Sequence, residues 1–234
     1  MQDRYAGDIG DFVKYGLLRA IRGTRRLGVA WYLHPDAGPA GDGKHIAYLQ
    51  DPDRWRHLDP ELFDALSVLI RCDQRSVANI QQSGILGDAV FAADPLALAD
   101  VKVRDRKRWR RHWFDRIKRQ LADCDLVFAD PDNGLVGDDR FNTTRQASAK
   151  SIPLAEAMDL AEERTAVIYH HNTRKRGGHI REIQWWKHQL PKGTMAYYWR
   201  RVSNRTFFVI NPDGEIRQRL RQFEARWGDR GQLV

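Results

Sequence analysis

The sequence predicts an α/β protein with a doubly wound, mostly parallel, Rossmann-like sheet and a C-terminal antiparallel hairpin. Short apolar runs of strand length, such as Leu126–Ala129, alternate with helical patterns along most of the 234 residues. This alternation is typical of a parallel sheet covered by helices. Two β-rich runs, 194–202 and 205–211, follow each other closely enough to form a hairpin. We therefore expect residues 1–234 to form a single α/β domain, with a helical insertion at about 44–85.

The spacing of apolar residues predicts the elements in chain order. Phe12, Tyr15 and Leu18 recur at helical spacing, so we expect a helix over 11–22 that Asp11 caps. By the same criterion, further helices are predicted over 60–70, 74–82, 109–122, 153–163, 178–190 and 215–227. Apolar runs predict strands over 28–33, 89–93, 126–129 and 165–169. Loops are expected over the glycine- and proline-rich segment 34–43 and over the polar segment 134–150, the second one long and mobile.

The composition excludes several classes of protein. The chain has no apolar run of about 18 residues that could cross a membrane, and its first residues lack the pattern of a signal peptide. The only two cysteines, Cys72 and Cys124, are too far apart for a zinc knuckle or a disulfide framework. We therefore expect a cytoplasmic protein that does not contact a membrane.

The charge of the chain is positive and clustered. Lysine and arginine total 39 against 31 aspartate and glutamate residues, which gives a formal net charge of +8. Between 102 and 119, basic residues alternate with Trp109 and Trp113, and a second basic run follows His171. Such clusters suit contacts with phosphates and stacked bases, although a solvated surface has the same composition. The predicted nucleic-acid contacts are Arg104, Arg108, Arg111, Lys118, Arg174 and Lys175.

Polar residues follow four of the predicted strands. Their sequences are H-P-D from His34, D-P from Asp94, D-P-D-N from Asp130 and H-H-N from His170. Strand exits are often polar for structural reasons alone, but in a doubly wound sheet these exits meet at the edge where ligands bind. The sequence therefore predicts a functional site at the carboxyl ends of these strands.

Five segments, in order along the chain, resemble a known enzyme family. Residues 5–15, read as Y-A-G-D-I-G-D-F-V-K-Y, are similar to the N-terminal H-A-G-N-x-A-D-x-x-K-H motif of bacterial methyltransferases that modify an adenine of large-subunit rRNA. Residues 31–38 resemble the first strand and D-x-H-A-G loop of that family, and 91–94 its acidic cofactor residue. Residues 130–133, D-P-D-N, fall at its D-P-P-Y tetrapeptide, and 208–212 resemble its I-N-P-P end.

The resemblance implies a class I methyltransferase that uses S-adenosylmethionine and acts on nucleic acid, with an adenine amine in RNA or DNA as the candidate target. Asp130 would accept a hydrogen bond from the amine, and Pro131 would offer its carbonyl oxygen. Together with the neighbouring strand end, the candidate catalytic residues are Asp130, Pro131, Asp132, Asn133 and His170. The candidate cofactor-binding residues are Tyr5, Gly7, Asp8, Lys14, His34, Asp36, Gly38 and Asp94.

Departures from the family pattern keep two alternatives open. Asn133 stands where the family has the tyrosine that stacks on the flipped base, and Asp132 adds a carboxylate. A metal-dependent phosphoesterase or nuclease would use these changes, with a divalent metal held by Asp130, Asp132, His170 and His171. The leading hypothesis needs no metal. The third reading is a catalytically inactive relative that binds nucleic acid with salt-dependent affinity.

Overall fold

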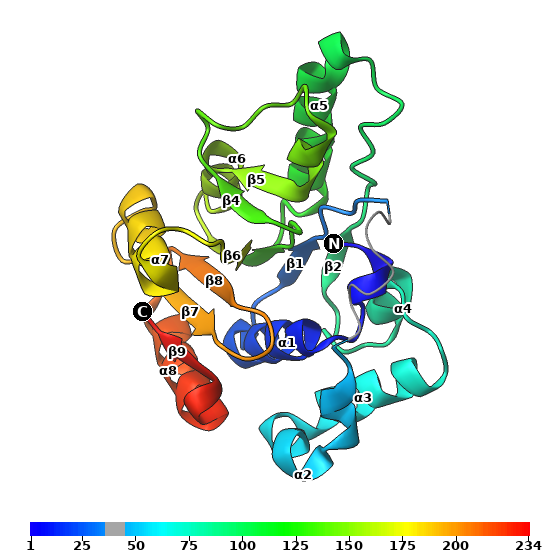
Figure 1. Ribbon diagram of the computed structural model, residues 1–234, viewed down its shortest axis with the longest axis vertical. Coiled ribbons are helices and arrows are strands. Elements are labelled where there is room, and N and C mark those ends of the chain that lie inside the picture. Colours follow the sequence, from blue (N-terminus) through cyan, green and yellow to red (C-terminus); the bar gives the residue numbers. More distant parts are fainter. Residues whose placement is uncertain (36–44) are drawn as a thin grey trace.

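A seven-stranded sheet forms the centre of the protein in the computed structural model, which describes residues 1–35 and 45–234 (Figure 1). Its spatial order is β2-β1-β3-β6-β8-β7-β9. The strands are β1 Leu27–Ala30, β2 Val90–Ala92, β3 Leu126–Ala129, β6 Thr165–His171, β7 Met195–Trp199, β8 Arg205–Ile210 and β9 Gly231–Leu233. β2, β1, β3 and β6 are parallel, and β8 runs antiparallel between β6 and β7. The predicted fold class is therefore confirmed, whereas β9, antiparallel to β7, was not predicted.

Helices cover both faces of this sheet. They are α1 Ile9–Arg22, α2 Pro52–Trp55, α3 Pro60–Arg71, α4 Val77–Gln82, α5 Arg106–Gln120, α6 Leu154–Leu160, α7 Gly178–Gln189 and α8 Gly214–Trp227. α1 and α8 pack on one face, and α5, α6 and α7 pack on the other. α2, α3 and α4 lie between β1 and β2, within the stretch predicted as a helical insertion. Among the helices described, none is long and apolar enough to cross a membrane.

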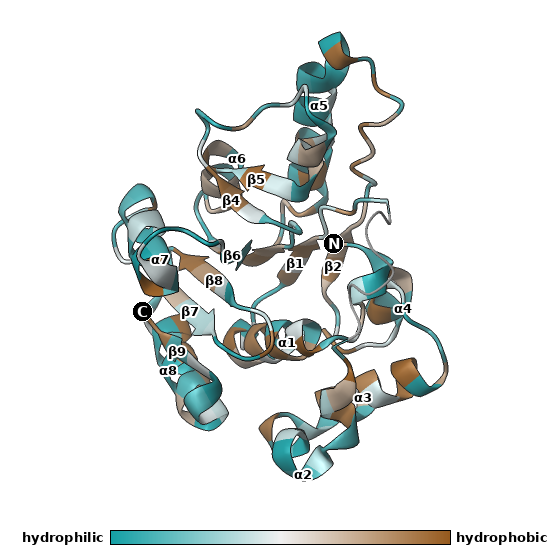
Figure 2. Ribbon diagram, in the orientation of Figure 1, coloured by the Kyte–Doolittle hydropathy of each residue, from teal (hydrophilic) through white to brown (hydrophobic). Residues whose placement is uncertain are grey.

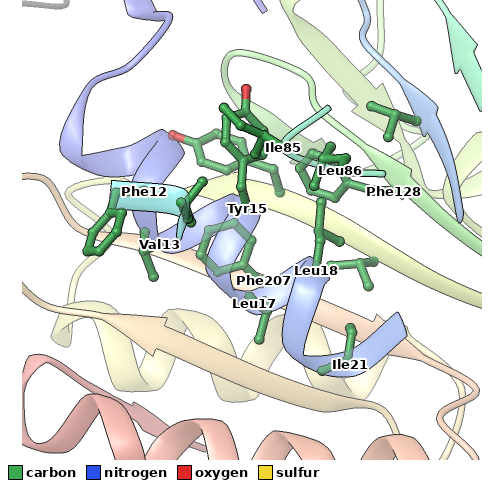
Figure 3. Packing of buried hydrophobic residues seen from close by; sticks show 14 of the residues in the cluster. Phe12, Val13, Tyr15, Leu17, Leu18, Ile21, Ile85, Leu86, Phe128 and Phe207 are labelled. Atoms are coloured by element: carbon green, nitrogen blue, oxygen red, sulfur yellow. The ribbon is translucent and has the colours of Figure 1, made fainter. Parts of the chain in front are cut away.

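Two cores result from the alternation of side chains along the strands. In β3, Phe128 faces the core under α1, whereas Val127 faces the core under α5 and α6. Figure 3 shows Phe12, Tyr15 and Leu18 of α1 among the buried side chains of the first core. The apolar spacing that predicted this helix therefore marks the face that it buries.

The helix α1 begins earlier than predicted. Its cap is Asp8, whose Oδ1 accepts hydrogen bonds from the backbone N–H groups of Gly10 at 2.7 Å and Asp11 at 3.0 Å. The prediction that Asp11 caps the helix is wrong, because Asp11 lies within the first turn. Its side chain is free to interact with Lys14, one turn further along the same face.

The segment 134–150 is not simply a long loop. Gly134–Val136 forms β4, which pairs in parallel with β5, Ser151–Pro153, in a small second sheet. Gly134 has φ 88°, and a Cβ atom there would lie 2.4 Å from the Cα atom of His170 in β6. A residue without a side chain is therefore needed for the small sheet to lie against the large one. The other predicted loop, 34–43, falls outside the described residues from Asp36 onward.

The sheet has a switch point between β1 and β3. From β1 the chain moves to β2 on one side, and it then returns to β3 on the other side. In sheets of this kind, ligands bind beyond the carboxyl ends of the strands beside the switch point. Asp130 directly follows β3, so the fold places it at this edge.

Candidate functional site

A polar pocket of about 300 Å³ opens at the carboxyl edge of the sheet, next to the start of α1. This volume is at the lower end of the range for small-molecule sites. Its charged lining consists of Asp8, Asp11, Asp130, Asp132, Lys14, Lys150, Arg205 and Met1 with its amino group. The rest of the lining consists of Gln2, Tyr5, His45, Asn133, Tyr169, His171 and Ser203. The pocket therefore joins residues from the first helix with residues that follow or end β3 and β6.

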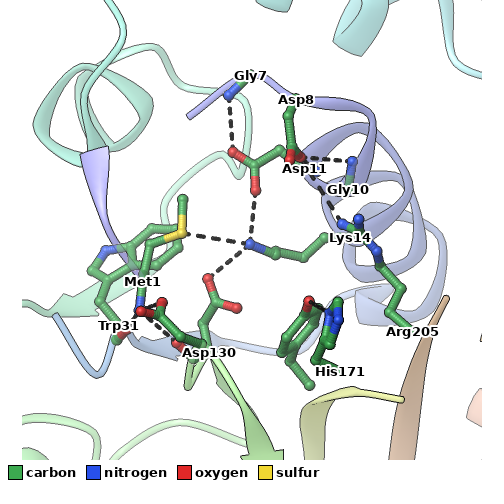
Figure 4. A network of polar contacts seen from close by, with 12 residues as sticks. Met1, Gly7, Asp8, Gly10, Asp11, Lys14, Trp31, Asp130, His171 and Arg205 are labelled. Atoms are coloured by element: carbon green, nitrogen blue, oxygen red, sulfur yellow. Dashed lines mark hydrogen bonds and ion pairs between the residues drawn. The ribbon is translucent and has the colours of Figure 1, made fainter. Parts of the chain in front are cut away.

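Lys14 lies between two carboxylates that come from distant parts of the chain (Figure 4). Its Nζ is 2.7 Å from Oδ1 of Asp11 and 2.7 Å from Oδ2 of Asp130, and the lysine is only 4% exposed. Burial opposes the charge of the ammonium, but the two carboxylates outweigh it and raise the pKa of Lys14. Burial also raises the pKa values of Asp11 and Asp130, against the effect of Lys14. The three groups thus form one coupled cluster.

Asp130 keeps one carboxylate oxygen available to the pocket. It continues the alternation of β3, so its side chain lies on the same face of the sheet as Phe128 and α1. Oδ2 accepts the hydrogen bond from Lys14, whereas Oδ1 accepts none from the residues that the structure describes. A ligand that donates a hydrogen bond therefore finds an acceptor here.

Both carboxylate oxygens of Asp132 have partners, whereas only Oδ2 of Asp130 has one among the described residues. Its Oδ1 lies 2.8 Å from the amino group of Met1, and its Oδ2 accepts a hydrogen bond from Gln2. Burial would raise the pKa of Asp132, but the ammonium of Met1 outweighs burial and lowers it. The same ammonium donates to the carbonyl oxygens of Trp31, Tyr32 and Asp130. Met1 therefore fills the crevice between β1 and β3, and the pocket lies beside it.

The two adjacent histidines face opposite sides of the sheet. β6 extends to His171, two residues beyond the predicted strand, so the alternation along a strand separates the two rings. His171 lines the pocket, whereas His170 packs among Trp186 and Phe208 on the α7 face. The prediction that His170 acts beside Asp130 is therefore corrected.

His170 has a structural role on the α7 face. Its Nδ1 accepts a hydrogen bond from the backbone N–H of Leu135 at 3.1 Å, so its proton is on Nε2, which faces Oε1 of Glu182 at 3.3 Å. Both carboxylate oxygens of Glu182 also accept from the backbone N–H of Thr173, and Oε1 accepts from the Thr173 hydroxyl. Although burial opposes it, these hydrogen bonds lower the pKa of Glu182 to about 2. The network joins β4, β6 and α7.

The predicted metal ligands do not form a metal site. Asp130 and Asp132 each face an ammonium group, and His170 is on the other face of the sheet. Within 1–35 and 45–234, no group of three or more histidine, cysteine, aspartate or glutamate residues is arranged to hold a metal ion. The donor set on which the hydrolase alternative depends is therefore not brought together.

Some of the predicted cofactor residues lie in or next to the pocket, and others do not. Tyr5, Asp8 and Lys14 line the pocket, and Gly7 supports it by donating its N–H to Oδ2 of Asp11 at 2.9 Å. Asp94 does not line the pocket.

Asp94 instead accepts a hydrogen bond from Nε of Arg116 in α5 at 2.9 Å. The ring of His34 is directed to the carbonyl oxygen of Pro35, at 2.7 Å, and does not line the pocket either. Asp36 and Gly38 lie outside the described residues. Of the D-P-D-N segment, Pro131 is buried, and Asn133 lines the pocket and donates its N–H to the carbonyl oxygen of Lys150.

The predicted nucleic-acid contacts are mostly accessible. Arg104, in the turn before α5, and Arg108, in α5, have side chains about four-fifths exposed, and Arg111 of α5 is exposed as well. Figure 2 shows α5 as largely hydrophilic. Lys118 differs, because its Nζ binds Oδ2 of Asp159 at 2.9 Å.

The second basic run lies before α7. Arg174 is exposed, and Nζ of Lys175 lies 3.4 Å from the ring centre of Trp185. Together with Arg176 and Arg181, Lys175 and Trp185 line a separate surface pocket. A cation over an exposed indole is the combination that sequence analysis associated with phosphates and bases.

Arg205 and Tyr169 are pocket residues that sequence analysis missed. Tyr169 lies inside the apolar run of β6, where the pattern predicts core, and Arg205 is the first residue of β8. Arg205 is a charged residue at a core-facing position of a buried strand. Charged residues are rarely buried, so this position could have indicated a functional role from the sequence.

Comparison with known proteins adds no assignment. No model of a protein family matches this chain, and no curated protein matches it.

Proposed function

We propose that this protein is an S-adenosylmethionine-dependent methyltransferase that acts on an amine of a nucleic-acid base, with adenine as the candidate target. One observation carries the proposal. The two segments with the most specific resemblance to rRNA adenine methyltransferases, 5–15 and 130–133, are far apart in sequence, yet Lys14 and Asp130 are 2.7 Å apart. Both segments line the same pocket, at the carboxyl edge of the sheet and beside its switch point, and doubly wound sheets bind their ligands at this edge.

The residues present suit a cofactor that carries positive charge. The carboxylate of Asp8 and the side chain of Tyr5 line the pocket wall. S-adenosylmethionine, when bound, supplies a methyl group on a positively charged sulfur. Asp8, Tyr5 and Lys14 are the residues that would hold it.

The chain's own groups would orient the target amine. Asp130 accepts one N–H of the amine through Oδ1, and the carbonyl oxygen of Pro131 is the second candidate acceptor. Lys14 favours the charged form of Asp130 and fixes its carboxylate through Oδ2. Positioning and preorganised charge of this kind are what methyl transfer requires, more than a strong base. The exposed arginines of α5 supply the positive surface for the nucleic-acid strand.

Asp130→Asn tests the proposal directly. The amide keeps the size of the side chain, and Lys14 retains Asp11 as a partner, so the fold and cofactor binding should persist. We expect S-adenosylmethionine affinity, measured by calorimetry, to stay within a few-fold of the original protein. Methyl transfer to RNA or DNA should fall by at least a factor of about 100, the size of effect seen when one preorganised polar group is removed.

Asp88→Asn is the matched control, because Asp88 is an exposed partner of Arg22 away from the pocket. It should bind and transfer like the original protein. Failure to detect S-adenosylmethionine binding at millimolar concentration would reject the proposal. Nucleic-acid cleavage that a chelator abolishes and that Asp132→Ala removes would instead favour the metal-dependent hydrolase.

A further inference from the structure

Arg205 is buried in the pocket wall without a full set of hydrogen-bond acceptors. The residue is 5% exposed, and its Nε donates to the carbonyl oxygen of Ser203 at 3.2 Å. The nearest carboxylate oxygen, Oδ1 of Asp8, is 4.0 Å from NH1, which is beyond hydrogen-bond distance. Within the described part of the chain, the two terminal NH₂ groups donate to no acceptor. A guanidinium at this depth normally donates most of its hydrogen bonds.

The surroundings of Arg205 fix its position and leave its charge uncompensated at close range. Its guanidinium lies against the first turn of α1, where a Cβ atom on Gly10 would be 1.3 Å from NH1 (Figure 4). Asp8 accepts from the backbone of α1 through its nearest oxygen. Lys14 is paired with Asp11 and Asp130, and Met1 with Asp132. Among the residues that the structure describes, Arg205 is therefore the buried cation of this pocket without an anion at hydrogen-bond distance.

The pKa of His171 depends on the charge of Arg205. The two residues are directly opposite in the antiparallel ladder of β6 and β8, on the same face of the sheet. Partial burial of the ring, and then the positive charge of Arg205, lower the pKa of His171. A negative group bound to Arg205 would relieve this effect.

We propose that Arg205 is the oxyanion-binding residue of the pocket and receives a carboxylate or phosphate group of the ligand. A guanidinium offers two parallel N–H donors that match the two oxygens of such a group. The source of the oxyanion rests on the proposed function: it is the α-carboxylate of the cofactor or a phosphate of the nucleic acid. The oxyanion site itself does not depend on that function.

Inorganic phosphate and acetate probe the site without any assumption about the reaction. In the original protein, each anion should shift the His171 ring resonances in an NMR titration and raise the pKa of His171. Arg205→Lys should weaken anion binding at least several-fold, because an ammonium cannot donate two parallel hydrogen bonds. Arg205→Met should weaken it at least tenfold.

Arg106→Lys is the matched control. Arg106 is also buried, at 7% exposure, but it donates to the carbonyl oxygens of Val101 and Thr144, away from the pocket. Anion binding should be unchanged in this variant. If Arg205→Met does not fold, as judged by circular dichroism, Arg205→Lys decides the outcome. Equal anion affinity in the original protein and Arg205→Lys, or no anion binding at all, would overturn the inference.

Two further binding experiments identify which ligand supplies the oxyanion. A preference for S-adenosylmethionine over decarboxylated S-adenosylmethionine, which keeps the sulfonium and the amine and lacks only the carboxylate, should be reduced in Arg205→Lys if the cofactor supplies the group. Loss of oligonucleotide affinity with the preference intact identifies the nucleic-acid phosphate instead. Arg205-dependent phosphate binding in a protein that does not bind S-adenosylmethionine would leave the inference standing and reject only the proposed function.

Discussion

Lys14 is the ammonium partner of two buried carboxylates, so its removal should cost stability as well as function. In Lys14→Met, Asp11 and Asp130 would remain buried without this partner, and we expect the free energy of unfolding at pH 7 to fall by about 3–5 kcal/mol. The pKa values of both carboxylates, already raised by burial, would rise further. The folded variant would then bind more protons than the unfolded chain, so its stability should increase as the pH falls from 7 to 5.

Urea denaturation across this pH range measures that effect. Adding Asp11→Asn to Lys14→Met removes one of the two unpaired charges and should recover part of the lost stability. A Lys14→Met protein as stable as the original at pH 7 would contradict the importance of this pair.

Glu182 gives a pH dependence of the opposite sign. Its pKa is lowered from an ordinary 4.5 to about 2, so it stabilises the folded protein fully above pH 4.5. This contribution should be lost as the pH falls from about 4.5 toward 2, because the folded state must then take up a proton that the unfolded state already holds. Glu182→Gln should be less stable at pH 7, by about 1–3 kcal/mol for the impaired buried hydrogen bonds.

The stability difference between Glu182→Gln and the original protein should therefore shrink in acid. Thermal unfolding at pH 7, 4 and 3 checks this expectation. Glu61→Gln is a suitable control, since Glu61 is an exposed partner of Arg19. A difference that stays constant with pH would show that the charge of Glu182 has no part in stability.

At the scale of the element, α5 and the turn before it combine structural and accessible basic residues. The described contacts leave Arg104, Arg108 and Arg111 exposed, so a triple change to glutamine should flatten the salt dependence of single-stranded oligonucleotide binding. With a slope of about −0.7 per phosphate contact in a log–log plot, three lost contacts reduce its magnitude by about 2. Lys118→Gln should have a smaller effect, because Lys118 already binds Asp159.

Fluorescence anisotropy at several salt concentrations measures this slope. A triple change to glutamine in α8, at Arg217, Arg221 and Arg226, removes the same charge from another helix and serves as the control. Equal slopes for the two triple variants would mean that binding reflects net charge alone rather than a contact surface on α5.

A two-residue error in the predicted end of β6 changes which histidine is assigned to the pocket. The apolar run ends at Tyr169, which predicts that His170 and His171 both follow the strand, whereas the strand includes them. Because strand neighbours face opposite sides, two added residues turn one histidine into a pocket residue and the other into a core residue. Apolar periodicity cannot locate such a boundary, since the hydrogen bonds to β8 determine it.

At the scale of the whole molecule, the order of strands and helices was enough to predict the fold class and the edge that carries the pocket. Asp130, which the strand exit predicts, and Lys14, Asp8 and Tyr5, which the resemblance implies, line this pocket. The prediction missed Arg205, because it considered only the ends of parallel strands. β8 runs antiparallel, so its first residue lies at the same edge as the last residues of β3 and β6. Only the strand order in space shows this.

At position 10, helix propensity favours alanine, whereas the packing of Arg205 requires glycine. Alanine is favoured over glycine within a helix by up to about 1 kcal/mol, so Gly10→Ala would satisfy the intrinsic tendency of α1. The added methyl group would nevertheless take the space of the Arg205 guanidinium. The gain in helix propensity therefore competes with the displacement of a buried guanidinium that lines this pocket. Gly10→Ala should weaken anion binding at Arg205, because the guanidinium can no longer occupy this position.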